Sequence, residues 1–299
     1  MLFKNAYVYR LTQPFTHETD ELIRQLETRT FVPCSGIKPS SFGWVAPLGN
    51  VEAPLVHEVS GCFLLCARRE DKVVPPSALN DLISARVDQV ESREGRKLRS
   101  KEKAAIKDDC LADLLPRALP RSKEIMGYIS PGDELLVVGT GSSTEAELFL
   151  DCLRDSLGTL PVVPPQVKSR PTDVFTHWLA NRKLPDHFSL GDQCDLMDPE
   201  DGSTVTCRRQ DLATNEIRGH IDAGKYCTRL GIRWHGDLKL AVDKDLALKQ
   251  IKVESSDDNT EAEDDPVARM DAAFAHMTLE FSRFLPALFS ALGGENRES

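Results

Sequence analysis

Residues 76–119 read PSALNDLISARVDQVESREGRKLRSKEKAAIKDDCLADLLPRAL, and this stretch decides how the chain is divided. Apolar residues recur at helical spacing on both sides of Gly95. The spacing predicts one helix from Ser77 to about Glu94 and a second that begins after Ser100. Each helix would be roughly 25 Å long at ~1.5 Å per residue. The stretch therefore predicts a helical hairpin that bends near Gly95.

Basic side chains gather at this bend. Residues 93–107 contain seven basic and two acidic residues, whereas the whole chain has a net charge of −10. Residues 254–265, expected to form an exposed loop, carry −7 of that charge. Binding to DNA depends on the local charge that faces the phosphates, so the total charge does not exclude a nucleic-acid partner. A solvated pair of surface helices explains the same pattern, and this alternative stays open.

The sequence around the hairpin alternates between strand and helix patterns. Residues 2–11 alternate like a strand and residues 17–28 are spaced like a helix. Strand patterns return at 121–130 and 134–139. We therefore expect an α+β fold with several lobes. Its central lobe comprises residues 1–75 plus 120–165, and the hairpin of residues 76–119 projects from it.

Residues 166–299 are expected to form a second α+β lobe with a C-terminal helix. Four prolines between residues 161 and 171 predict a stiff connector before it. Strands are expected at 203–208, 225–235, 237–243 and 247–253, with a helix near 214–223. The C-terminal helix would start with Asp265 as its N-cap. Its stripe of Phe and Met is more often packed on its own lobe than in a subunit interface, and Pro286 is expected to kink or divide it.

Composition favours a cytoplasmic globular protein. Charged residues make up 28% and hydrophobic residues 40% of the chain. No apolar run reaches the ~18 residues of a membrane span, and the N-terminus lacks a signal-peptide pattern. The eight cysteines form no CxxC pair and show no zinc-finger spacing. We expect buried cysteines that behave as small hydrophobic residues, and no metal site.

No motif predicts a catalytic site or a cofactor. GTGSST at residues 139–144 lacks the GK[ST] ending of a Walker A loop and the third glycine of GxGxxG. A nucleotide-binding enzyme that uses this loop stays as an alternative. Asp192 with Asp195, and Glu200 with Asp201, are imaginable as metal ligands, but an acidic surface loop explains them better.

Several longer motifs occur in a fixed order along the chain. They are MLFKNAYVYRL, FVPCSGIKPSSFGWVAPLG, LLPRALPR, HIDAGKYCTRLGIRWHGDLKL and a closing LGGE. This ordered set resembles the RdgC family of bacterial recombination-associated DNA-binding proteins, from Met1 to about Glu295. The resemblance implies a non-catalytic, nucleoid-associated protein that binds DNA with little sequence preference. It also implies a ring-shaped homodimer whose hole admits duplex and which restrains the RecA recombinase. Single-stranded DNA is a further candidate ligand, and a protein-interaction scaffold is a further alternative function.

Basic residues in three regions are candidate DNA contacts. Alternation places Lys225, Arg229 and Arg233 on one face of a strand, and Arg208, Arg209 and Gln210 end the strand before it. Arginine and lysine on such a face suit phosphate contact, and the resemblance implies that this face lines the ring. Ion pairs with Glu216 and Asp222 are the alternative explanation. The other candidates are Lys97, Arg99, Lys101, Lys103, Arg117 and Arg121.

The resemblance also implies a role for LLPRALPR in closing the ring. In the family this segment lies where the two hairpin tips meet, which makes Arg117 and Leu119 candidates for the dimer gate. Many relatives carry an aromatic residue where this chain has Leu119. Closure is still expected, but without an aromatic stacking contact.

Overall fold

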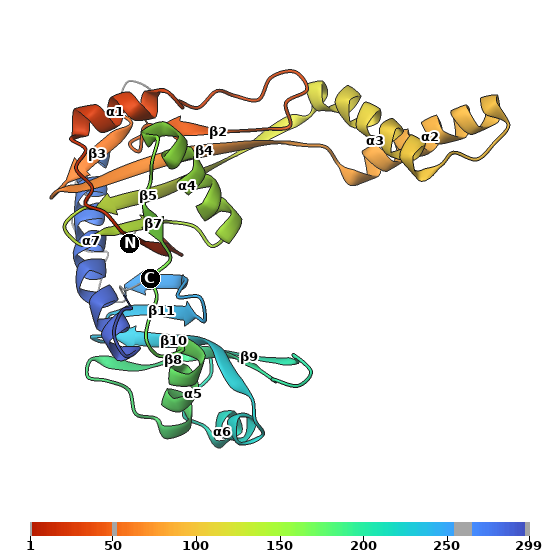
Figure 1. Ribbon diagram of the computed structural model, residues 1–299. Helices are drawn as coiled ribbons and strands as arrows, with labels where there is room; N and C mark the ends of the chain where they lie inside the picture. The colour runs from red at the N-terminus through yellow and green to blue at the C-terminus, as the bar shows by residue number, and fades with distance from the viewer. Residues whose placement is uncertain (1, 50–52, 254–264, 297–299) are drawn as a thin grey trace.

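The computed structural model describes residues 2–49, 53–253 and 265–296. Helices and strands are mixed along the chain, which confirms the α+β prediction. The described strands form two antiparallel sheets (Figure 1). None of the described helices is long and apolar enough to cross a membrane.

The first sheet is built mainly from the N-terminal half of the chain. Its order is β2-β4-β5-β6-β1-β7, and β3 pairs with β4. Helices α1 (Thr19–Glu27) and α4 (Ser143–Leu157) cover one face of this sheet, where the rings of Trp44 and Phe149 meet edge to face at 5.1 Å. The strands are β1 (Tyr7–Leu11), β2 (Ser40–Val45), β3 (Val56–Val59), β4 (Cys62–Val73), β5 (Leu119–Ser130), β6 (Leu135–Val138) and β7 (Val162–Val163).

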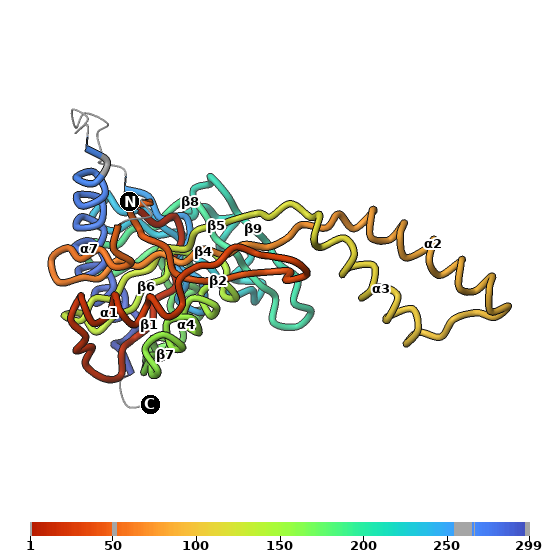
Figure 2. Tube along the Cα trace, turned by 90° about the horizontal axis from the view of Figure 1, so that it is seen from above, coloured from red at the N-terminus to blue at the C-terminus, as the bar shows by residue number. Residues whose placement is uncertain are grey.

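Two helices project from the end of this sheet (Figures 1 and 2). Strands β4 and β5 pair from Phe63↔Ile129 out to Val73↔Leu119. Beyond that point α2 (Pro76–Glu94) leads outward and α3 (Ser100–Leu114) returns, followed by a 3₁₀ turn, η1 (Leu115–Arg117). Gly95 ends α2 in the left-handed region with φ 65°, a conformation that favours glycine. Helix α2 begins with Pro75, not Ser77, at its N-cap position.

The second sheet has the order β12-β11-β10-β8-β9. Helix α5 (Pro171–Asn181) packs on β10, and α6 (Asn215–Asp222) packs beside α5. The expected acidic loop around Asp192 and Asp195 is wrong, because both residues belong to the inner strand β8. The strands are β8 (Phe188–Met197), β9 (Thr204–Arg208), β10 (Tyr226–Trp234), β11 (Leu238–Asp243) and β12 (Leu248–Val253).

Two connections hold the sheets together. Residues 4–6 extend the edge of β12, where the amides of Ala6 and Leu248 donate to each other's carbonyls at 2.8 and 2.9 Å. Helix α7 (Pro266–Ala291) packs against both sheets, since Phe274 contacts Tyr128 at 5.7 Å and Phe284 contacts Trp234 at 5.7 Å between ring centroids. One hydrophobic core therefore includes residues of both sheets.

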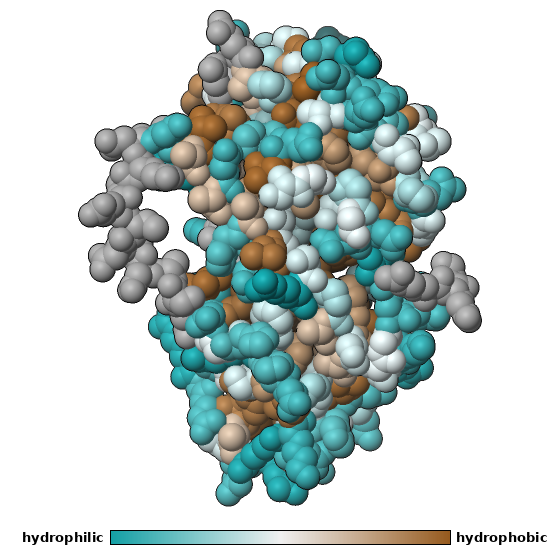
Figure 3. Space-filling view, turned by 90° about the vertical axis from the view of Figure 1, so that its left-hand side faces the viewer, coloured by the Kyte–Doolittle hydropathy of each residue, from teal (hydrophilic) through white to brown (hydrophobic). Residues whose placement is uncertain are grey.

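The apolar stripe of α7 is used inside the subunit, as the commoner explanation predicted. Its buried residues are Phe274, Met277, Phe281, Phe284, Leu288 and Leu292. Asp265 caps the helix by accepting a hydrogen bond from the amide of Val267 at 2.9 Å. Pro286 lies inside α7 and does not divide it, because the helix continues to Ala291; a kink at this position stays a prediction. On the side of the molecule where α7 lies, apolar residues are scattered in small groups between polar ones (Figure 3). The acidic residues 254–264 lie outside the described residues.

Candidate functional site

The second sheet has one apolar face and one charged face. Leu230, Ile232 and Trp234 of β10 lie in the core with α5 and α7, so Arg229 and Arg233 lie on the opposite face. The same alternation on neighbouring strands creates what we call the polar face of the second sheet. It carries Arg208, Arg229, Arg233, Lys239, Lys249 and Lys252 together with Asp192, Asp195, Asp243 and Gln193.

Ion pairs and amide contacts run across the polar face. Arg229 donates to Asp195 at 2.6 Å, and a guanidinium nitrogen of Arg208 lies 3.8 Å from the same carboxylate. Lys239 reaches Asp192 at 2.9 Å although β10 lies between their strands. The face is therefore a connected network.

Gln193 is the amide centre of this network. Arg208 donates to its side-chain oxygen, and its side-chain nitrogen donates to Gln250 on β12 at 2.8 Å. Only 6% of Gln193 is exposed. Because β10 and β11 lie between β8 and β12, this contact joins distant strands of the sheet and fixes the arrangement of the charges around it.

The acidic members of the face differ in their electrostatics. The hydrogen bond from Lys239 lowers the pKa of Asp192, so that carboxylate is ionised at neutral pH. Burial raises the pKa of Asp243, although backbone amides of Ala247 and Asp245 oppose the shift. Asp195 Oδ1 and Arg229 Nε are both buried without a hydrogen-bond partner among the described residues. The Arg229–Asp195 pair thus uses only part of its hydrogen-bonding capacity.

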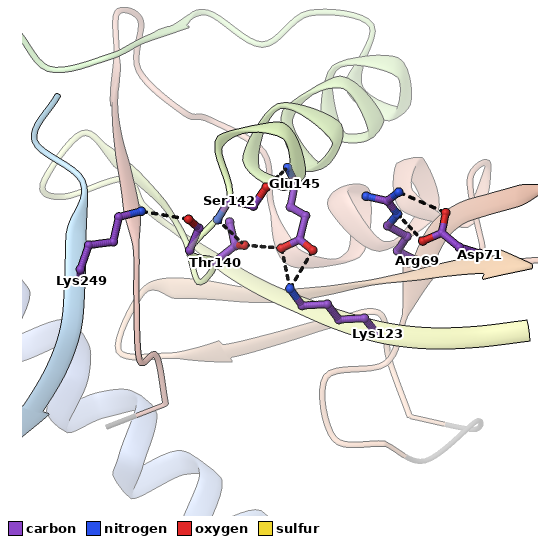
Figure 4. A network of polar contacts seen from close by, with 8 residues as sticks. Arg69, Asp71, Lys123, Thr140, Ser142, Glu145 and Lys249 are labelled. Carbon is purple, nitrogen blue, oxygen red and sulfur yellow. Dashed lines mark hydrogen bonds and ion pairs between the residues drawn. The ribbon is translucent and has the colours of Figure 1, made fainter. Parts of the chain in front are cut away.

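Lys249 connects the polar face to the first sheet. Its ammonium lies 4.4 Å from the ring centre of Tyr7 and donates to the Gly141 carbonyl at 3.0 Å. Figure 4 shows the hydrogen bond of Lys249 at the loop between β6 and α4. Lys123 and Arg69 lie farther from Lys249 in the same view. In register, Arg69 faces Lys123 across β4 and β5, and Asp71 faces Arg121. Basic residues therefore extend from the polar face to the base of the projecting helices, and two of them are paired with carboxylates, Lys123 with Glu145 and Arg69 with Asp71.

The glycine loop beside Lys249 has a structural explanation. A side chain at Gly139 would lie 2.6 Å from the Phe3 ring, so only glycine fits there. Ser142 caps α4 by accepting from the Glu145 amide at 3.4 Å. Burial opposes the charge of Glu145, but hydrogen bonds from Lys123 and Thr140 lower its pKa overall. A carboxylate thus occupies the helix N-terminus where a bound phosphate would be placed.

The cations expected at the hairpin bend lie around the end of the projecting helices, and several are already paired. Lys97 contacts Glu91 at 2.6 Å, and Lys103 lies 3.8 Å from the same carboxylate. Arg96 contacts Glu102 at 2.6 Å, and its hydrogen bond lowers the pKa of Glu102 to about 2. Arg99, the N-cap of α3, and Lys101 in its first turn are exposed. The basic run is therefore partly neutralised by its own acidic residues.

The strand candidates separate into different environments. Arg208 and Arg209 are exposed, with 42% of the Arg208 side chain accessible. Gln210 donates to Glu216 at 3.2 Å. Lys225 precedes β10, and its amine contacts Asp198 at 2.8 Å with only 15% of the side chain exposed.

The side chains of Lys225 and Arg229 are mostly covered, which leaves less of them available for phosphate contact. The turn between β8 and β9 covers Lys225 and supplies Asp198 and Ser203 as its partners. Arg229 lies against Asp195, and 23% of its side chain is exposed. The alternative explanation by ion pairs is therefore correct for Lys225 and Arg229, but their acidic partners are Asp198 and Asp195, not Glu216 or Asp222 of α6.

Arg117 and Leu119 lie at the base of the helix pair, not at its tip. Leu119 starts β5 and faces Val73 of β4, which fixes this segment to the sheet. The whole of α3 separates it from the bend, about 22 Å at 1.5 Å per residue. The expected position at the hairpin tip is therefore wrong for this subunit. Arg117 is exposed and Leu119 is 80% exposed, and the gate role stays a prediction.

Sequence reasoning missed three lysines of the polar face, namely Lys239, Lys249 and Lys252. Part of the signal was available, because each lies in an expected strand and Lys239 stands between the buried residues Leu238 and Leu240. Register places Lys252 opposite Lys239, and Lys249 opposite Ala241. The partners Asp192 and Asp195 were not identified because β8 was not recognised.

The described residues include no group of three or more His, Cys, Asp or Glu side chains that could hold a metal ion. All eight cysteines are free, and all but Cys34 are buried. Burial raises the pKa of Cys194 to about 12, which keeps this thiol protonated at neutral pH.

Comparison with known proteins identifies relatives over nearly the whole chain. The family model described as "Putative exonuclease, RdgC" matches residues 1–295. The recombination-associated protein RdgC of Aeromonas hydrophila subsp. hydrophila is 41% identical, with 99% of each chain covered. The protein of the same name from Tolumonas auensis is also 41% identical, with both chains fully covered. The one from Pseudomonas aeruginosa is 38% identical over 99% of this chain and 98% of its own. This chain belongs to the RdgC family of recombination-associated proteins.

Proposed function

We propose that this protein binds duplex DNA through the phosphate backbone, without catalysing a reaction on it. One observation carries the proposal: the polar face of the second sheet has six cationic and three acidic side chains in a chain whose net charge is −10. A local excess of positive charge on an otherwise acidic protein suits a polyanionic ligand.

The types of side chain favour backbone contact over base reading. Lysine and arginine supply charge and hydrogen-bond donors to phosphate, and phosphate contacts carry no sequence information. The basic row from Lys249 through Lys123 to Arg121 adds positions at the base of the projecting helices. We therefore expect binding that tolerates any sequence, with contributions from Arg208, Arg209 and the exposed lysines of the helix pair.

The assembly that we propose is a closed homodimer. A two-fold ring needs two separate self-complementary contacts, because one isologous contact gives an open dimer. The second lobe and the projecting helix pair are well separated in the subunit, which suits one contact each (Figure 1). DNA held by such a dimer would be less accessible to the RecA recombinase, and this occlusion is the mechanism we propose for a role in recombination.

Salt dependence of binding to two duplexes of unrelated sequence tests the proposal. Both duplexes should bind alike, and log affinity should fall linearly with log salt, with a slope of about −0.9 for each phosphate contacted. Lys252→Gln, on the polar face, should weaken binding and flatten the slope. Lys183→Gln, at an exposed position just beyond α5, removes the same charge and should change neither. Affinity that does not respond to salt would contradict the proposal.

The description of the family as an exonuclease calls for a separate test. End-labelled duplex incubated with the pure protein and Mg²⁺ or Mn²⁺ should be recovered at full length. The protein would be shown to be an enzyme if the wild type shortened the labelled strand and a single-residue variant that still binds DNA did not.

A further inference from the structure

The acidic residues of β8 lie among the cations proposed to contact DNA. Asp195 has Arg229 on one side at 2.6 Å and Arg208 on the other at 3.8 Å. Asp192 holds Lys239 at 2.9 Å. Each carboxylate therefore occupies the place beside lysine or arginine that a phosphate oxygen of DNA would take.

We propose that Asp195 and Asp192 act as internal substitutes for phosphate and lower the affinity of the polar face for DNA. This inference rests on the proposed function. The two carboxylates compete with DNA for the same donors, and they repel the phosphates that approach. The carboxylates thus hold Arg208, Arg229 and Lys239 in position for phosphate contact in the free protein, but they lower the affinity for DNA.

The contacts of Asp195 fit competition better than a purely structural pair. An arginine commonly binds a carboxylate through two parallel hydrogen bonds. Here Arg229 Nε and Asp195 Oδ1 are both buried without a partner among the described residues. Arg208 is anchored by its hydrogen bond to Gln193 but lies 3.8 Å from Asp195, and 42% of its side chain faces solvent. A phosphate can therefore approach the exposed part of Arg208 while Asp195 keeps Arg229 in place.

Asp192 offers an independent position with less burial. Its side chain is 37% exposed and contacts Lys239, whose side chain is 21% exposed. The ammonium keeps Asp192 ionised, so a phosphate near Lys239 meets a full negative charge there. Removing that charge strengthens the attraction of the face for phosphates and removes one competitor for the ammonium of Lys239.

The experiment compares Asp195→Asn and Asp192→Asn with the wild type and with Asp222→Asn. Asp222 lies on α6, which packs beside α5 on the side away from the polar face, and its side chain is 69% exposed. All three variants change the net charge equally. Each β8 variant should bind duplex about threefold to tenfold more tightly, from Coulomb attraction over several ångströms. Its salt slope should steepen by about one for each additional phosphate that the cations of the polar face then neutralise.

The possible outcomes separate this inference from the function it rests on. If the wild type does not bind duplex, both fall. If the wild type binds but the β8 variants bind no more tightly than Asp222→Asn, the inference is wrong and the function stands. Weaker binding by a folded β8 variant also overturns it, because the carboxylate would then be needed to position its partner. If Asp195→Asn unfolds, the more exposed Asp192→Asn decides.

Discussion

At the scale of single residues, Arg10 ties the C-terminal LGGE motif to the first sheet. Its guanidinium forms two parallel bonds with Glu295, at 2.7 and 2.8 Å, and also donates to the Asp133 carbonyl. Only 13% of the Arg10 side chain and 12% of the Glu295 side chain are exposed. Arg10→Leu removes the guanidinium that pairs with this largely buried carboxylate and should lower the free energy of unfolding by about 3 kcal/mol.

Urea denaturation measures this change, and Arg154→Leu is the matched control. Arg154 also pairs with a carboxylate, Asp151 at 2.6 Å, but both side chains are well exposed. Loss of such a surface pair should cost less than about 1 kcal/mol. Equal effects of the two substitutions would show that the LGGE contact contributes no more than an ordinary surface pair.

At the scale of elements, the helix pair α2–α3 has little buried side-chain surface. Helix α2 has no buried residue, and α3 buries only Cys110. Helix α7, by contrast, places a continuous stripe in the core. Because local stability follows burial, amides of α2 and α3 should exchange with deuterium faster than those of α7.

Hydrogen exchange followed by mass spectrometry measures this difference in the free protein. DNA that contacts the exposed lysines near the bend should slow exchange in the helix pair while leaving α7 unchanged. Protection of α2 equal to that of α7 in the free protein, at a concentration where it is monomeric, would contradict the argument from burial.

The elements also show what periodicity in the sequence can reveal. Strands β9 to β12 were predictable because polar and apolar residues largely alternate in β9 to β11, as in Leu238-Lys239-Leu240, and β12 combines apolar residues with lysines. Strand β8 was not, because Gly191 and two aspartates interrupt its pattern and its pairing with β10 contains register shifts. The cations of the site were therefore partly predictable, whereas their acidic partners depend on a tertiary arrangement that no local pattern contains.

At the scale of the whole molecule, the two sheets behave as parts of one body. Residues 4–6 continue the edge of β12, and α7 packs on both sheets. This arrangement brings Lys249 to the loop before α4 and makes the basic row continuous between the sheets. The order of residues along the chain gives no direct indication of the row, because Lys123 and Lys249 are far apart in sequence.

The proposed ring makes its sharpest prediction at Leu119. This side chain is 80% exposed and faces Val73, itself 51% exposed, where the helix pair leaves the sheet. In the monomer, Leu119→Asp should alter stability little, because the side chain is already in water. In a closed dimer it would place a charge in an apolar contact. We expect faster dissociation from covalently closed circular duplex, with an unchanged salt slope, since the phosphate contacts remain.

Dissociation rates from circular and linear duplex of the same sequence test this role, with Leu279→Asp as the control. Leu279 is another exposed leucine, 49% accessible, on α7 and away from the helix pair. Closure traps circular DNA, whereas linear DNA can also leave through its ends. Only Leu119→Asp should therefore narrow the difference between the dissociation rates of the two duplexes. If both leucine variants leave circular duplex as slowly as the wild type, Leu119 does not close the ring. If both accelerate release equally, added negative charge alone explains the effect.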